Sequence, residues 1–265
     1  MMVRGLVLWL ACATMLSSAE DLDALFRRAQ GDRAAVVPLI LAGSEALARL
    51  PPDDSAALAE RLAPFCRAAA CSPERYPAME RLGLVTHRIV ARETPTSVSR
   101  RYGVGAGLIT RLNPGPFTVG RELKVLDARE PLTLVISRSR FRLFVWRGRI
   151  LLAVMPVSLG RPGRETPLGT TTVRLRVRNP EWRDPDTGRI FAPKDPGNVL
   201  GGYWLGFDPL KSRAFAGIGI HGFTAERPEA WLGTASSHGC VRLTQPDVAL
   251  VFDLAMPGVR VVVRD

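Results

Sequence analysis

The sequence predicts an α+β protein with a helical N-terminal region, a small module with a strand at each end, and a mainly β domain carrying one helix near its end. Apolar residues recur at helical spacing in residues 20–84, whereas short runs of β-branched and aromatic residues occupy residues 131–265. The 265 residues, 46% of them hydrophobic, suffice for one sizeable core and smaller modules.

Residues 1–19 have the organisation of a secretory signal peptide. Arg4 supplies positive charge, residues 5–16 form a mostly apolar core, and Ser17-Ser18-Ala19 offers small residues for cleavage. The apolar core is short for a membrane span, and no later segment is long enough. Leu10-Ala11-Cys12 leaves lipid attachment at Cys12 as an alternative. We therefore expect an exported protein of the periplasm or cell envelope.

Residues 20–84 are expected to be helical, with a packing or spacing function. Leu22 begins a run of apolar residues at helical spacing, and Pro38 is expected to disturb a second helix. A last short helix is expected to open at Ser72-Pro73-Glu74 and to stop at Gly83.

The cysteine count agrees with export. Cys12 would leave with the signal peptide and Cys240 is a candidate nucleophile, which leaves Cys66 and Cys71 as a natural pair. We expect these two to form a disulfide across a loosened helix end, with two buried thiols as the alternative.

The β domain begins at Pro131 and continues to residue 265. Its expected strands are residues 132–136, 141–146, 150–157, 171–177, 203–205 and 259–263. A helix is expected from Gln245 to Leu254, with Thr244 as its cap. The irregular, proline- and glycine-rich residues 178–202 predict either a flap over a groove or a plain surface excursion.

The candidate chemistry lies in two short stretches, Ile220-His221-Gly222 and Ser237-His238-Gly239-Cys240. A nucleophilic cysteine attacks as the thiolate, and histidine is the usual base because its pKa lies near neutral pH. Gly239 lets the backbone turn sharply and leaves successive N–H groups free to face an oxyanion. Flanking apolar residues predict two buried strands that deliver this site at their ends.

The spacing of His221, Ser237-His238-Gly239-Cys240 and Arg242 resembles the signature of the L,D-transpeptidases of the YkuD type. The resemblance covers residues 131–264, including Thr166-Pro167-Leu168-Gly169-Thr170, and implies the mixed β-sheet domain of that family. It implies Cys240 as nucleophile and His221 as base, with support from Ser237, His238, Gly239 and Gly222. Substrate-binding candidates are Arg242, Tyr203 and Trp204. A zinc site formed by His221, His238 and Cys240 is the other interpretation, although a fourth ligand is missing.

Residues 85–127 are expected to form a strand, two short helices and a strand, an arrangement that resembles a LysM module. The resemblance implies binding of N-acetylglucosamine-containing glycans, with Thr94, Pro95 and Asn113 as candidate residues. The usual Gly-Asp-Thr turn is Arg92-Glu93-Thr94 in this chain. A small packing domain is the alternative.

Together these features predict a peptidoglycan L,D-transpeptidase that uses a cysteine acyl-enzyme and acts on stem peptides and glycan strands. The alternatives are a carboxypeptidase or crosslink hydrolase, an enzyme that anchors proteins to peptidoglycan, and a noncatalytic wall-binding protein. The resemblance implies no metal or organic cofactor. The net charge of +11 favours polyanionic surroundings such as an anionic cell wall, and the scattered arginines argue against a nucleic-acid site.

Overall fold

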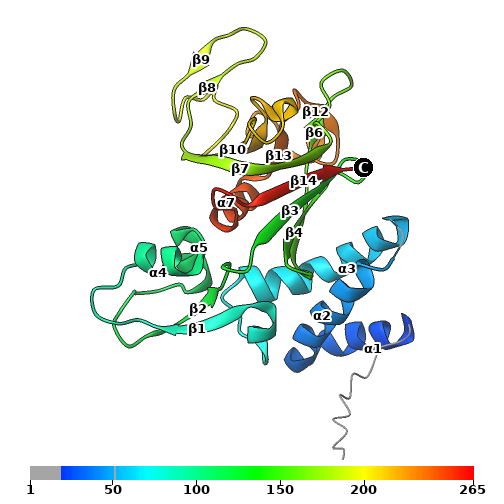
Figure 1. Cartoon of the computed structure of the whole chain (residues 1–265), viewed down its shortest axis with the longest axis vertical. Coiled ribbons are helices and arrows are strands. Elements are labelled where there is room, and N and C mark those ends of the chain that lie inside the picture. The colour runs from blue at the N-terminus through cyan, green and yellow to red at the C-terminus, as the bar shows by residue number, and fades with distance from the viewer. Residues whose placement is uncertain (1–18, 51) are drawn as a thin grey trace, which may run out of the picture.

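The computed structural model describes residues 19–50 and 52–265 (Figure 1). The predicted signal peptide lies outside the described residues except for Ala19, and so does the alternative lipid-attachment site at Cys12. In the described part of the chain, no helix combines the length and the apolar character that crossing a membrane requires.

Three helices form the N-terminal region: α1 (Ala19–Ala29), α2 (Val36–Leu47) and α3 (Pro52–Cys71). Pro38 does not disturb α2, because it lies in the first turn, where a backbone N–H has no intrahelical partner. The helix expected from Ser72 is absent among the described residues. A 3-10 turn at Met79–Leu82 takes its place and ends at Gly83 in a left-handed conformation.

The predicted Cys66–Cys71 disulfide is wrong in this structure, where both thiols are free and buried. Helix α3 continues to Cys71, so its last turn does not loosen. At about 100° per residue, two side chains five positions apart point in directions about 140° apart on the helix surface. Cys71 contacts Leu152 of the β domain instead, with Sγ 3.9 Å from the carbonyl oxygen.

Residues 84–126 have the strand–helix–helix–strand order expected from the sequence. They comprise β1 (Leu84–Arg88), α4 (Pro95–Tyr102), α5 (Ala106–Leu112) and β2 (Glu122–Leu126), and the two strands pair antiparallel. Hereafter these residues are called the βααβ module.

The remaining chain forms a mixed sheet, as predicted. The sheet has eight strands in the order β13-β11-β10-β7-β14-β3-β4-β5. Strand β14 pairs parallel with β3 and antiparallel with β7, and β11 pairs parallel with β13. The strands are β3 (Leu132–Ser137), β4 (Arg142–Arg147), β5 (Ile150–Pro156), β7 (Gly169–Arg178), β10 (Tyr203–Phe207), β11 (Gly219–Gly222), β13 (Val241–Leu243) and β14 (Arg260–Arg264).

Smaller elements complete the domain. Strand β6 (Leu159–Gly160) pairs with β12 (Ala235–Ser237), and β8 (Trp182–Arg183) pairs with β9 (Ile190–Phe191). Helix α7 (Gln245–Leu254) contacts β10, β11 and α5, whereas α6 (Pro228–Trp231) precedes β12. At the other edge of the sheet, α2 and α3 pack against β5.

A buried lysine and a backbone hydrogen bond join the βααβ module to its neighbours. Lys124 of β2 is buried, and its Nζ donates to the carbonyl oxygens of Ala69, Ser72 and Glu74 at the C-terminal end of α3. Burial lowers the pKa of Lys124 to about 8. On the other side, the Gly105 N–H donates to the Asp253 carbonyl oxygen of α7 at 2.6 Å. The module is therefore held between α3 and α7.

Candidate active site

Three adjacent strands place the candidate site residues in a row. The sheet register pairs Trp204 of β10 with His221 of β11, and His221 with Arg242 of β13. Because paired residues point to the same side of a sheet, these three side chains share one face. Cys240 lies two residues before Arg242, so the same alternation brings it to this face.

Tyr203 lies on the opposite face of the sheet from Trp204, so its predicted function in substrate binding is wrong. Its ring packs 5.0 Å from that of Phe252 in α7, and the guanidinium of Arg178 lies 5.4 Å from its centroid. Successive residues of a strand point to opposite faces, so Tyr203 and Trp204 cannot both line the same groove.

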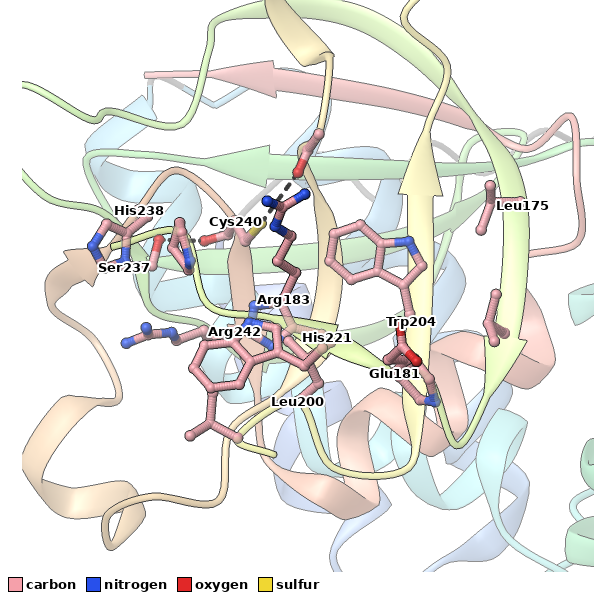
Figure 2. A pocket seen from close by; sticks show the side chains of 16 residues that line it. Leu175, Glu181, Arg183, Leu200, Trp204, His221, Ser237, His238, Cys240 and Arg242 are labelled. Carbon is pink, nitrogen blue, oxygen red and sulfur yellow. Dashed lines mark hydrogen bonds between the residues drawn. The ribbon is translucent and has the colours of Figure 1, made fainter. Parts of the chain in front are cut away.

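The row opens onto a cavity of about 520 Å³ that Figure 2 shows from close by. Its polar lining includes Cys240, His221, His238, Ser237 and Arg242, and its remaining walls come from β7, β10 and residues 180–200. The lining is completed by Leu175, Val177, Pro180, Glu181, Trp182, Arg183, Pro185, Val199, Leu200, Trp204 and Gly217.

His221 is buried and held in one orientation. Its Nδ1 contacts the Gly222 carbonyl oxygen, and its ring stacks on Trp204 with centroids 5.8 Å apart. A carbonyl oxygen can only accept, so Nδ1 carries the proton and Nε2 keeps a free lone pair. Burial lowers the pKa of His221 to about 4, helped by the positive charge of Arg242 and opposed by the bond to Gly222. The imidazole is therefore neutral at neutral pH.

Cys240 is also neutral at rest. Burial raises the pKa of its thiol to about 11, opposed by a backbone hydrogen bond from Gly219 and by the charge of Arg242. The thiol points toward the Gly217 carbonyl oxygen at 3.9 Å, and part of the residue remains exposed to the cavity. A thiolate at rest is thus disfavoured, although the thiolate is the attacking species. Thiol ionisation has to accompany attack on a substrate.

The turn before Cys240 is fixed by hydrogen bonds of its own. Ser237 Oγ accepts from Gly239 N at 3.1 Å and donates to the Cys240 carbonyl oxygen at 2.6 Å. Thr166 Oγ1 donates to the Gly239 carbonyl oxygen at 2.9 Å and accepts from Gly160 N at 3.0 Å. Sequence reasoning missed this function of Thr166, although the Thr-Pro-Leu-Gly-Thr stretch was a signal for it.

Gly239 has φ +113°, and a Cβ there would lie 2.9 Å from Ile218 Cδ1, so the turn requires glycine. Its N–H is occupied by Ser237, which corrects the expectation that successive N–H groups of this turn are free. The Cys240 N–H donates no hydrogen bond to any residue within 19–50 and 52–265. That N–H remains available to an oxyanion in the cavity.

Residues 178–202 border the cavity together with Cys240, which favours the flap over a plain surface excursion. The ring of Trp182 stacks on Phe191 with centroids 5.1 Å apart, which fixes the β8–β9 hairpin. The buried Asn198 amide donates to the carbonyl oxygens of Pro180 at 2.9 Å and Ala192 at 3.2 Å. We refer to residues 178–202 as the flap.

The flap also touches the turn before Cys240. His238 Nε2 lies 2.9 Å from Asp186 Oδ2. These two atoms form no hydrogen bond, and the contact is an ion pair only when His238 is protonated. His238 therefore supports the cavity wall from the side opposite to Trp204 (Figure 2).

Arg242 is positioned to bind an anion. Its guanidinium lies over the Phe223 ring, 4.0 Å from the centroid, and its Nη1 donates to the Ser236 carbonyl oxygen at 3.3 Å. Its Nε is buried and has no partner among the described residues. Burial lowers the pKa of Arg242 from its ordinary value, but a guanidinium stays charged in proteins.

The candidate glycan residues have structural functions in the βααβ module. Asn113 is buried, and its Nδ2 donates to the carbonyl oxygens of Ile109 and Lys124, both at 2.8 Å, which uses both of its N–H groups. Thr94 caps α4 by accepting from Ser97 N, and Pro95 occupies the first turn of that helix. Asn113 is therefore withdrawn as a glycan contact, whereas Thr94 is exposed.

The zinc interpretation finds no support in the described part of the chain. There, no three His, Cys, Asp or Glu side chains lie close enough together to hold a metal ion. His221 Nδ1 is committed to the Gly222 carbonyl oxygen, and His238 faces Asp186.

Comparison with known proteins identifies the family. Residues 131–263, half of the chain, match the model of the YkuD L,D-transpeptidase catalytic domain. The chain belongs to the YkuD family. Its relatives include the putative L,D-transpeptidase YqjB of Bacillus subtilis, which is 31% identical over 136 residues covering 51% of this chain and 72% of the relative.

Another relative in the YkuD family is the probable L,D-transpeptidase YbiS of Escherichia coli K12. It is 29% identical over 184 residues, covering 60% of this chain and 56% of the relative, so the chain spans about half the length of that protein. Among solved structures, an L,D-transpeptidase from Mycobacterium smegmatis aligns with 20% identity and a TM-score of 0.42, covering 56% of this chain and 65% of that one.

Proposed function

We propose that this protein is a peptidoglycan L,D-transpeptidase that works through an acyl-enzyme on Cys240. The observation that carries the proposal is the orientation of His221, whose Nδ1 is tied to Gly222 while its neutral imidazole lines the same cavity as the thiol. Membership of the YkuD family supplies the class of substrate.

In the proposed first step, Cys240 Sγ attacks the carbonyl carbon of the amide between an L-centred diamino acid and the terminal D-alanine. The thiol proton passes to His221 Nε2, the ring nitrogen that carries a free lone pair. The Cys240 N–H donates to the oxyanion, and such a donor contributes about 3–4 kcal/mol to transition-state stabilisation. When the C–N bond breaks, the proton passes from His221 to the leaving D-alanine amine.

The acceptor step reverses this proton path. An amine from a neighbouring stem peptide attacks the thioester carbonyl and gives a proton to His221, which returns it to the Cys240 sulfur as the new amide forms. Water as the acceptor would make the protein a carboxypeptidase or crosslink hydrolase, and a protein amine would make it an anchoring enzyme. A noncatalytic wall-binding function is disfavoured by the intact Cys240 and His221 pair.

The test is to incubate the protein without its predicted signal peptide with a tetrapeptide donor and a stem-peptide acceptor, and to determine product masses. We expect a crosslinked product and free D-alanine. A hydrolysed tripeptide alone would indicate the carboxypeptidase, and no product together with no acyl-enzyme would refute the proposed chemistry.

We further propose that the protein acts in the periplasm or cell envelope and that the βααβ module tethers it to glycan strands. The module exposes Val90 and Val119, 54% and 68% exposed, on the two loops that flank its strands. The Gly120 N–H donates to the Ile89 carbonyl oxygen at 2.8 Å, which brings these loops together. Sedimentation of the full chain with insoluble wall should weaken in Val119→Asp. Unchanged sedimentation would show that the module is a packing domain.

A further inference from the structure

Two oppositely charged side chains of the flap face the cavity without a partner. Glu181 and Arg183 are exposed, flank Trp182 in the chain and line the cavity with Cys240. Neither side chain makes an ion pair or a hydrogen bond with any residue that the structure describes. By contrast, Asp184 of the flap accepts from Asp186 N at 2.9 Å.

Contacts within the flap fix the backbone that carries these two residues. The stacking of Trp182 on Phe191 and the Asn198 bond to the Pro180 carbonyl oxygen fix the chain on both sides of Glu181. Residues two apart in an extended chain point to the same side, with Cα atoms about 7 Å apart. Glu181 and Arg183 therefore leave the backbone at neighbouring points of the flap, and they line the cavity with one negative and one positive group.

The cavity beneath them suits an aliphatic chain with a charged end. Leu175 and Val177 of β7, together with Trp204 and Leu200, form an apolar wall. Figure 2 shows Arg183 reaching into the pocket on the side of Cys240, and Glu181 on the side of Trp204. A few methylene groups can lie along the apolar wall while polar groups at their end meet the flap.

We propose that Glu181 and Arg183 are specificity-determining residues that select an acyl donor whose side chain ends in a zwitterion, with an ammonium and a carboxylate on one carbon. This inference rests on the proposed function. A guanidinium binds a carboxylate through two parallel N–H donors, and a carboxylate accepts from an ammonium. A side chain that ends in an ammonium alone would satisfy Glu181 and leave Arg183 unpaired, whereas Arg242 remains for the carboxylate of the leaving residue.

Binding can be measured separately from chemistry in the Cys240→Ala protein. Three tetrapeptides would be titrated by calorimetry: one with meso-diaminopimelate at the third position, one with its side-chain carboxylate amidated, and one with lysine. We expect the first to bind about tenfold more tightly than the other two, because a charge-assisted hydrogen-bonded pair is lost in each.

Each charge has its own signature in this assay. Arg183→Gln should remove the preference for the free carboxylate and leave binding of the lysine peptide unchanged. Glu181→Gln should weaken binding of all three peptides by a similar factor. Lys194→Gln, which removes an exposed positive charge of the same flap outside the cavity, is the matched control and should change nothing.

Equal affinities for the three peptides, no measurable binding of any of them, or a preference that survives Arg183→Gln would overturn this inference. Release of D-alanine by the protein with Cys240 intact tests the proposed function separately. Release from all three donors at equal kcat/KM would sustain the function while overturning the selectivity. Selective binding without any release of D-alanine would sustain the selectivity and overturn the proposed function.

Discussion

The neutral resting state of Cys240 makes a quantitative prediction about its reaction with a simple alkylating agent such as iodoacetamide. This reagent reacts with the thiolate that is already present, because the thiolate is the nucleophilic form of cysteine. With the pKa raised from 9.0 to about 11, the thiol at pH 8 is about 0.1% ionised, compared with about 9% for an ordinary thiol.

The thiolate is thus about 100-fold scarcer, whereas its higher basicity makes each thiolate about tenfold more nucleophilic. Alkylation of Cys240 at pH 8 should therefore be about tenfold slower than that of free cysteine. The rate should rise by about tenfold per pH unit and should not level off below pH 10. Acylation by a bound donor should instead stay flat between about pH 5 and 9, since it depends on neutral His221, whose pKa is about 4.

The assay is peptide mapping by mass after timed alkylation, with Cys240→Ala as the control for the buried Cys66 and Cys71 thiols. A rate that levels off between pH 6 and 8 would show a thiolate–imidazolium pair at rest, and the general-base description would be wrong.

Three further predictions concern stability, each measured by urea denaturation. Gly107→Ala should destabilise the protein by about 1–3 kcal/mol, because its Cβ would clash with Asp253 Oδ2. Gly31→Ala is the control, because its Cβ would meet no atom within 4 Å. Equal losses of stability in the two variants would contradict the close packing of α5 on Asp253. Lys124→Met should cost at least about 2 kcal/mol by leaving buried carbonyl oxygens without a donor, and a neutral result would refute the capping function. His221 is neutral in the folded protein, so its contribution to the free energy of unfolding is complete above its unfolded pKa of 6.5. That contribution is lost as the pH falls toward the folded pKa of about 4, by about 3 kcal/mol in total. His221→Gln should lack this loss, and an unchanged pH dependence in the variant would be inconsistent with the lowered pKa.

The sequence was sufficient for most strands and for the elements that carry the motif. The runs from Leu132 and from Ile150 became β3 and β5, and the helix capped by Thr244 became α7. Period-two patterns and caps are local signals, which explains this success. The spacing of His221 and Cys240 is likewise a local pattern, and it indicates the family.

The predictions failed where the function of a side chain depends on which element packs on each face of a strand or helix. Tyr203 and Trp204 are adjacent aromatic residues, and only the position of α7 decides which one faces the cavity. Asn113 is a candidate glycan contact by resemblance, but its side chain is buried and hydrogen-bonded to β2. Glu181 and Arg183 lie in an irregular segment, where sequence carries no periodic signal for the direction of a side chain.

The most direct test of the central claim, a Cys240 acyl-enzyme formed with His221 as base, is the intact mass of the protein after exposure to a carbapenem. The family resemblance implies that the strained lactam carbonyl acylates the nucleophilic cysteine. We predict one covalent adduct that maps to the peptide containing Cys240, is absent in Cys240→Ala and forms much more slowly in a folded His221→Ala variant. An adduct that forms equally fast without His221, or no adduct in the folded protein with Cys240 intact, would contradict the account.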